Sequence, residues 1–188
     1  MTIDILPLIP AREADFLAFF EGDAFADNPR WSSCYCQFLY VDHNSVTWSE
    51  RTAQENRAQA CERIGACRMQ GYLAYRDGKA VGWFNAAPRE LLDSFADEPD
   101  PDAARLGEIT CFVVAKAHRR KGVAKALLEA ACEGLRAQGL EIAEAMPKAE
   151  ATSDAENHYG PRSLYESAGF AEHRRTDDGL VIMRRQLV

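Results

Sequence analysis

The stretch EITCFVVAKAHRRKGVAKALLEAA, residues 108–131, contains the pattern that decides the fold. It opens with an apolar run, EITCFVV, that is typical of a buried strand. From Gly122 to Gln138 the apolar residues recur at helical spacing, and Gly139 provides a helix stop. A further strand-like run, LEIAEAMP, comes next. Strand, helix and strand in this order predict a parallel βαβ unit.

The residues before this unit predict a strand, two helices and a hairpin. The strand is TIDILPLI and the first helix is AREADFLAFFEG. A second helix is predicted over residues 45–69, with Ser45 as its N-cap. Residues 72–88 predict a hairpin, because Asp77-Gly78 separates two strand-like runs. The buried stripe expected on the second helix is Trp48, Ala53, Ala60 and Ile64.

The residues after the βαβ unit complete the fold. PRSLYESAGF predicts a short helix, and FAEHRRTDDGLVIMRRQL predicts a closing hairpin. The acidic residues 91–107 predict a solvated loop. The whole order predicts one domain over residues 1–188, of α/β class with mixed α+β character. We expect a twisted mixed β-sheet of about seven strands with helices on both faces.

Composition narrows the classes of function. The chain of 188 residues has a formal net charge of −7, which argues against a general nucleic-acid binder and suits a cationic small molecule or basic peptide better. No apolar segment approaches the roughly 20 residues of a membrane span. Asp4 stands where an export signal would carry a basic residue, so we expect a cytoplasmic protein whose six cysteines are reduced. Cys34-x-Cys36 lacks zinc-site spacing, so no metal site is expected.

The cationic residues before Gly122 suggest a phosphate cradle. A helix N-terminus leaves backbone N–H groups without intrahelical partners, and the helix dipole adds partial positive charge. Arg119, Arg120 and Lys121 add mobile cationic groups, and Gly122 lets a ligand approach the backbone closely. The pattern is neither a Walker loop nor a dinucleotide-binding fingerprint. The alternative interpretation is a solvated, basic helix start.

Two motifs together resemble a known family. The first is a strand followed by Arg119-x-x-Gly122-x-Ala124 and a helix; the second is Leu164-Tyr165-x-x-x-Gly169-Phe170. Their types and order resemble the GCN5-related N-acetyltransferase (GNAT) superfamily. Two departures stand out: Lys116 replaces a frequent proline, and His158 takes the place of a frequent asparagine, with Asn157 one residue away.

The resemblance implies a GNAT-like sheet and acetyl-CoA as cosubstrate. It implies that Phe112, Val113 and Val114 offer backbone groups to the pantetheine arm, and that Asn157 contacts the cofactor near the last helix. The phosphates would lie against the loop and the first helical turn. The residues of this phosphate site are Arg119, Arg120, Lys121, Gly122, Val123, Ala124 and Lys125.

The resemblance also implies direct transfer of acetyl to an amine. A base must then take the amine's proton, and an acid must protonate the departing thiolate. Glu108 is the candidate base from its place at the strand start, with a solvated edge glutamate as the alternative. Tyr165 is the candidate acid, with a packing role as the alternative. Cys111 and Cys132 are expected to be small buried apolar residues.

The acceptor site is expected in the aromatic segment after the first helix. Trp31 and Tyr35 there, and Trp83 on the third strand, are candidates for holding a cationic amine by cation–π contact, or else plain core. The acidic residues 93–102 could steer a cation inward or form only a solvated face. Expected partners are a small-molecule amine or a peptide, with no nucleic acid and no membrane, and a homodimer is possible from the resemblance. The alternative function is a non-catalytic acyl-CoA sensor.

Overall fold

The computed structural model describes residues 3–151, 153 and 157–188. These residues form one seven-stranded sheet in the order β1-β2-β3-β4-β5-β7-β6. The strands are β1 (Asp4–Pro7), β2 (Gly71–Arg76), β3 (Lys79–Pro88), β4 (Leu106–Val114), β5 (Ile142–Ala145), β6 (Ala171–Arg175) and β7 (Val181–Gln186). The predicted class, a mixed sheet of about seven strands, is confirmed.

The strand directions confirm the predicted βαβ unit. β4 and β5 run parallel, with Leu106 opposite Ile142, and α3 (Val123–Ala137) connects them. All other neighbouring strands pair antiparallel. The predicted hairpins are the pairs β2–β3 and β6–β7. At the first turn Asp77 and Gly78 both have positive φ, at 51° and 75°, which is the backbone that the Asp-Gly signal predicts.

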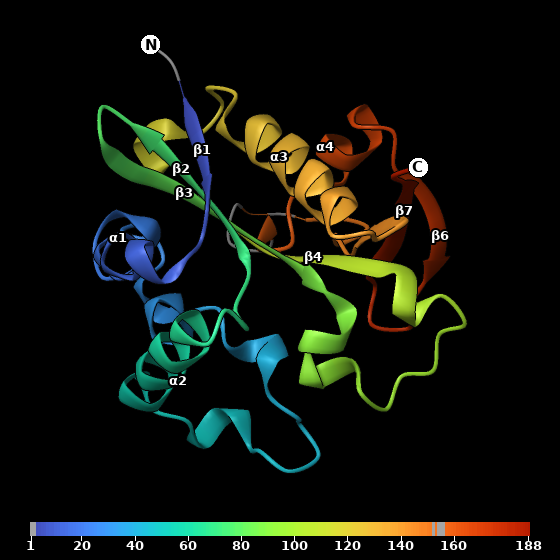
Figure 1. Cartoon of the computed structure of the whole chain (residues 1–188), viewed down its shortest axis with the longest axis horizontal. Coiled ribbons are helices and arrows are strands. Elements are labelled where there is room, and N and C mark those ends of the chain that lie inside the picture. Colours follow the sequence, from blue (N-terminus) through green and yellow to red (C-terminus); the bar gives the residue numbers. More distant parts are fainter. Residues whose placement is uncertain (1–2, 152, 154–156) are drawn as a thin grey trace.

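Helices cover both faces of the sheet. α1 (Glu13–Phe20) and α2 (Ala53–Gly65) lie on one face, and α3 and α4 (Arg162–Ser167) lie on the other (Figure 1). Each face has its own buried cluster, one around Phe16, Phe20 and Trp83, the other around Leu127 and Phe84. In the described part of the chain, no helix is long and apolar enough to cross a membrane.

The second predicted helix begins later than its sequence pattern suggested. α2 starts at Ala53, and its N-cap is Thr52, whose side chain accepts the N–H of Glu55 while the Glu55 carboxylate accepts the N–H of Thr52. This reciprocal capping box satisfies two N–H groups at once, which the predicted cap Ser45 cannot do. Trp48 therefore lies outside the helix, in a short 3-10 turn. The buried positions Ala60 and Ile64 are as predicted.

The acidic segment between β3 and β4 is more structured than the predicted loop. It contains three 3-10 turns, at 89–91, 93–95 and 103–105. Its carboxylates pair with arginines: Asp100 and Asp102 contact Arg184, and Glu98 contacts Arg89. These ion pairs hold the segment against the sheet.

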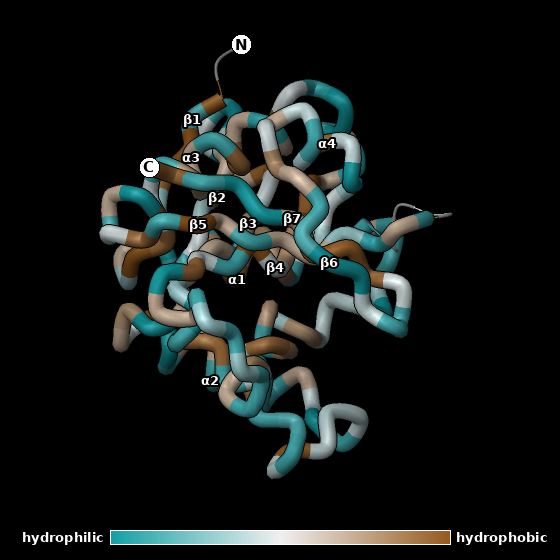
Figure 2. The backbone as a smooth tube through the Cα atoms, turned by 90° about the vertical axis from the view of Figure 1, so that its right-hand side faces the viewer, coloured by the Kyte–Doolittle hydropathy of each residue, from teal (hydrophilic) through white to brown (hydrophobic). Residues whose placement is uncertain are grey.

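The outer strand β6 is mainly hydrophilic (Figure 2), and all five of its residues are exposed. Its sequence, AEHRR, places charged side chains on this edge. Charges on an edge strand oppose pairing with another chain.

β4 extends beyond its partner β5, and this opens a gap in the sheet. Their pairing ends at Ile109 and Ala145, whereas β4 continues to Val114. The N–H of Ala115 donates to Val81 on the β3 side. Because backbone groups alternate in direction along a strand, those of Phe112 and Val114 point away from β3, toward the gap.

Candidate active site

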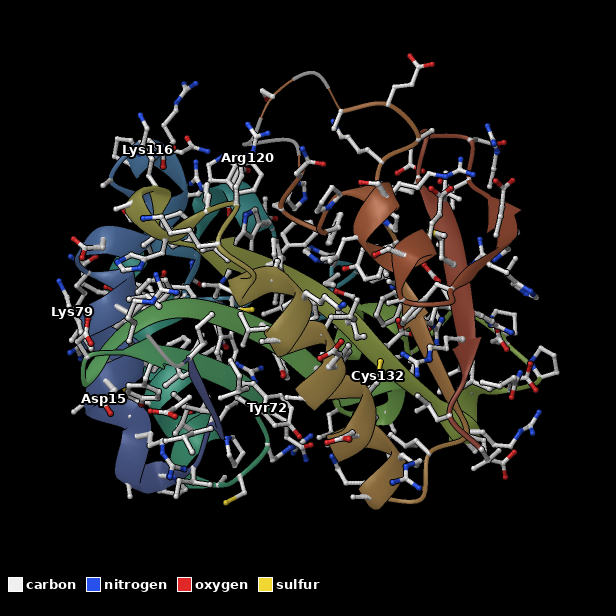
Figure 3. All side chains as sticks on the ribbon, turned by 90° about the horizontal axis from the view of Figure 1, so that it is seen from above. Asp15, Tyr72, Lys79, Lys116, Arg120 and Cys132 are labelled. Carbon is white, nitrogen blue, oxygen red and sulfur yellow. The ribbon has the colours of Figure 1, made fainter. Side chains whose placement is uncertain are left out.

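The predicted phosphate cradle is the loop that leads into α3. Arg120 and Gly122 both adopt left-handed backbone, with φ of 59° and 82°, and Gly122 is the N-cap of α3. No side chain among the described residues caps this helix end. Figure 3 shows Lys116 and Arg120 at this same end of the molecule. The loop therefore combines uncapped N–H groups, the positive end of a helix dipole and cationic side chains.

Arg119 is oriented by two partners. Its Nε donates to the carbonyl oxygen of Val114 at 3.0 Å. Its terminal nitrogens donate to both carboxylate oxygens of Asp27, at 2.6 and 3.0 Å. Hydrogen bonding to Arg119 lowers the pKa of Asp27, against the opposing effect of burial. The guanidinium is thus fixed beside the loop before any ligand binds.

A cavity of about 770 Å³ begins at this loop. Most of the predicted cofactor-binding residues line this cavity. Lys121 and Val123 are not on its wall: the Lys121 ammonium donates to the carbonyl of Ala117 at 2.8 Å, and Val123 is buried in the core. The predicted residues that do line the cavity are Phe112, Val113, Val114, Arg119, Arg120, Gly122, Ala124, Lys125 and Asn157.

A second, smaller cavity of about 420 Å³ adjoins the first. The two share Phe25, Trp31, Val113 and His158 on their walls. Trp31, a predicted acceptor residue, is therefore at the junction. The smaller cavity is the place where a second ligand could approach a group held in the larger one.

The other two predicted acceptor residues lie in the core instead. Trp83 is fully buried, and its ring packs edge-on against Phe16 at 5.0 Å between centroids. Tyr35 stacks on Phe20, and its hydroxyl donates to Glu21 at 3.3 Å. Neither side chain lines either cavity. Their aromatic character serves packing, which was the alternative interpretation.

His158 is a site residue that the motif analysis did not select. Its ring lies 4.5 Å from the ring of Trp31 and 4.1 Å from that of Tyr159, measured between centroids. Its carbonyl oxygen accepts the N–H of Phe112 at 2.8 Å, which ties this segment to β4. The signal in the sequence was the departure itself, a histidine in place of a frequent asparagine.

Glu108, the predicted base, is enclosed in the protein interior. Its Oε1 accepts a hydrogen bond from Arg89 at 2.6 Å, and Arg89 also lies 3.6 Å from Glu144. Burial and the neighbouring Glu144 raise the pKa of Glu108 to about 8, although Arg89 opposes the shift. The residue lines neither cavity. Glu108 is thus part of a buried, hydrogen-bonded cluster with Arg89, and it is not the solvated edge glutamate of the alternative.

Tyr165, the predicted acid, is also buried. Its hydroxyl donates to the carbonyl oxygen of Tyr159 at 2.6 Å, and burial is the main cause that raises its pKa well above the ordinary value. The preceding residue, Leu164, lines the larger cavity, and Tyr159 lines the smaller one. Tyr165 thus lies behind the walls of both cavities.

Cysteines also lie around the smaller cavity. Cys34, Cys36 and Cys111 are on its wall, and all three are free thiols. Burial raises the pKa of Cys34 to about 11. A thiol with that pKa stays protonated at neutral pH and is a poor nucleophile. The described residues contain no cluster of histidine, cysteine and acidic side chains able to hold a metal ion.

Comparisons with known proteins agree with this architecture. The family model of the acetyltransferase (GNAT) family matches residues 31–170. An N-acetyltransferase from Staphylococcus aureus Mu50 is similar in structure, with a TM-score of 0.63, 17% identity and 100% of each chain covered. The ribosomal-protein-alanine N-acetyltransferase from Brucella melitensis gives 0.59 at 19% identity, with 99% of each chain covered. The PaiA N-acetyltransferase from Thermoplasma acidophilum, in complex with coenzyme A, gives 0.58 at 16% identity and the same coverage.

No curated protein matches the chain in sequence. At these identities the solved structures establish the fold, and the family model establishes the family. The matched range contains both motifs, the loop from Arg119 to Ala124 and the helix end from Leu164 to Phe170. The family predicted from these two motifs is confirmed: the chain belongs to the acetyltransferase (GNAT) family.

Proposed function

We propose that this protein is an N-acetyltransferase that transfers the acetyl group of acetyl-CoA directly to an amine. The observation that carries the proposal is the junction of two cavities at Trp31, Val113 and His158. The larger cavity begins at a cationic loop and helix N-terminus, and the smaller one has mainly apolar walls. A phosphate-bearing acetyl donor and an amine can therefore approach one shared wall.

The residues of the larger cavity fit coenzyme A. Arg119, Arg120 and the backbone N–H groups after Gly122 would hold its phosphates. The N–H of Phe112 is bonded to His158 and the carbonyl of Val114 to Arg119, so the carbonyl of Phe112 and the N–H of Val114 are the groups that could pair with an amide-bearing arm in the gap between β4 and β5. Coenzyme A bound to the related Thermoplasma acidophilum enzyme supports this assignment. When bound, acetyl-CoA supplies a thioester carbonyl as the acetyl donor.

We assign proton removal from the amine to His158. An alkyl ammonium has a pKa of roughly 10, so it must lose a proton before it can attack a carbonyl. His158 lies on the walls of both cavities, and a neutral imidazole is a common general base. It can accept the proton directly or through one water molecule. Glu108 as the base stays a prediction, and its enclosure beside Arg89 favours a structural role.

Tyr165 remains our proposed proton donor to the departing thiolate. Its hydroxyl lies at the carbonyl of Tyr159, directly behind the wall of the smaller cavity. The burial that raises its pKa keeps the phenol protonated, as an acid requires.

The proposal is tested by measuring thiol release from acetyl-CoA with a panel of amines, amino acids and peptides. His158→Gln is expected to lower kcat and to remove the acidic limb of the kcat–pH profile, with acetyl-CoA affinity unchanged. His173→Gln on the exposed edge strand β6 is the matched control. An unaltered pH profile in His158→Gln would exclude His158 as the base. Stabilisation by acetyl-CoA without turnover on any amine would instead support a non-catalytic acyl-CoA sensor.

A further inference from the structure

The described wall of the smaller cavity contains a cationic residue and no acidic one. Among the described residues on its wall, Arg30 is the one arginine or lysine, and there is no aspartate or glutamate. The remaining wall is mainly apolar and aromatic. Its large apolar and aromatic side chains are Phe20, Phe25, Trp31, Phe38, Leu39, Trp48 and Tyr159. A ligand with several positive charges would find no described carboxylate there to balance them.

The acidic residues of the 93–102 segment do not line the smaller cavity, and three of them are bonded to other side chains. Asp100 contacts Arg184 at 2.5 Å, and Glu98 contacts Arg89 at 3.3 Å. Asp97 accepts a hydrogen bond from Asn44 at 2.8 Å. No acidic residue of this segment is therefore in place to contact a cation inside the smaller cavity.

Arg30 is available to a ligand. It lies in the 3-10 helix Pro29–Cys34, next to Trp31, and its residue is exposed. It has no hydrogen bond or ion pair with the residues that the structure describes. Guanidinium groups bind carboxylates well, because two parallel N–H donors match two carboxylate oxygens. A cation here also disfavours a second positive charge nearby, which helps an amine reach its neutral, reactive form.

Two aromatic side chains on the wall of the smaller cavity are suited to contact an apolar group. Phe38 and Trp48 meet edge to face with centroids 5.1 Å apart, and both line the cavity. Phe38 is 39% exposed, an unusual exposure for a large apolar side chain in this protein. Contact with an apolar ligand would remove this surface from water.

Resting on the acetyltransferase function proposed above, we propose that the acceptor is a free α-amino acid with an apolar or aromatic side chain. Its side chain lies among the aromatic residues of the smaller cavity, its carboxylate binds Arg30, and its amine faces Val113 and His158 at the junction. A volume of about 420 Å³ is in the range of small-ligand sites. In the reaction a nitrogen–carbon bond to acetyl forms, the thioester carbon–sulfur bond breaks, and the amine's proton is balanced by protonation of the coenzyme A thiolate.

The test combines two ligands with two variants of the full chain. L-Phenylalanine and L-phenylalaninamide differ only in the carboxylate. Arg30→Gln removes the proposed partner of that carboxylate, and Arg136→Gln is the control, an exposed arginine in the last turn of α3. Arg30→Gln is expected to raise KM for L-phenylalanine about tenfold and to leave KM for the amide nearly unchanged. Arg136→Gln should change neither.

A binding measurement separates this proposal from the proposed function. Trp31 and Trp48 line the cavity, so their fluorescence reports L-leucine without acetyl-CoA or turnover. The dissociation constant for L-leucine should also rise about tenfold in Arg30→Gln. L-Leucine binding without turnover on any amine would overturn the acetyltransferase function and support the amino-acid site. Turnover on spermidine with no binding of either amino acid would support the enzyme and overturn the site. Equal losses for L-phenylalanine and its amide in Arg30→Gln would overturn carboxylate recognition.

Discussion

Replacing Gly122 by aspartate tests the phosphate loop by adding one negative charge. Gly122 has φ of +82°, and an added Cβ would meet no atom within 4 Å, so only the backbone conformation opposes a side chain. Aspartate tolerates this left-handed region better than most residues. As an N-cap at the positive end of the α3 dipole, it also recovers part of the strain. We therefore expect a folded variant with an unfolding free energy within about 1 kcal/mol of the parent.

The expected loss of acetyl-CoA affinity is larger. Two unit charges about 4 Å apart repel by about 1 kcal/mol in water and about 4 kcal/mol near a partly desolvated surface. Gly122 is exposed, so the aqueous value applies. Repulsion of two phosphate charges then amounts to about 2 kcal/mol, which lowers the affinity about thirtyfold.

Gly139→Asp is the matched control. Gly139 lies just beyond the other end of α3, with φ of +87° and no atom within 4 Å of an added Cβ. Its carboxylate would stand at the negative end of the same dipole, so it should lower stability but leave acetyl-CoA affinity unchanged. Calorimetry measures the affinity, and urea unfolding measures the stability. An unchanged affinity in a folded Gly122→Asp variant, or an equal loss in Gly139→Asp, would refute the assignment of the loop.

Three further substitutions test other parts of the structure. Tyr165→Phe removes the hydrogen bond to Tyr159 and should lower the unfolding free energy by about 1 kcal/mol. In this variant kcat should fall much more than the affinity for acetyl-CoA. If the variant and the parent have equal kcat under conditions where chemistry limits the rate, Tyr165 is not the acid. Because the pKa of Glu108 is raised in the folded state, Glu108 keeps its proton between about pH 5 and 8 in the folded protein but loses it in the unfolded chain. The unfolding free energy should therefore fall as the pH rises through this range, by up to about 1.4 kcal/mol per pH unit. Glu108→Gln should flatten that slope in urea unfolding, and an identical slope would contradict the buried-carboxylate interpretation. Thr52→Ala should lower the unfolding free energy by about 1 kcal/mol, and an unchanged urea midpoint would show that the capping box contributes little.

The fold was largely predictable because its signals are local. The helical spacing after Gly122 and the Asp77-Gly78 turn each depend on a few adjacent residues. The start of α2 was less predictable for the same reason. Ser45 and Thr52 are both acceptable N-caps in isolation, and only the reciprocal bonds of Thr52 with Glu55 decide between them.

The phosphate loop was also predictable, because a single stretch of chain forms it. The acceptor cavity is formed by segments that are far apart in the sequence. Residue type alone therefore does not identify which side chains line it. Trp31 lines the cavities whereas Trp83 is buried against Phe16, although both are tryptophans in plausible places. Glu108 illustrates the same limit, because its partner Arg89 lies on another segment and encloses it.

Net charge alone does not predict the charge of the ligand at a particular site, for an electrostatic reason. A charge of −7 suggested a cationic ligand, but a charge acts on a ligand only if it is close and not already paired. Asp100 is paired with Arg184, so its field falls off rapidly with distance. Arg30 lies at the smaller cavity and has no partner among the described residues, so its charge is not balanced by a described carboxylate. An acidic protein can therefore present two neighbouring sites that both favour anionic groups, the phosphates of a cosubstrate and the carboxylate of an amino acid.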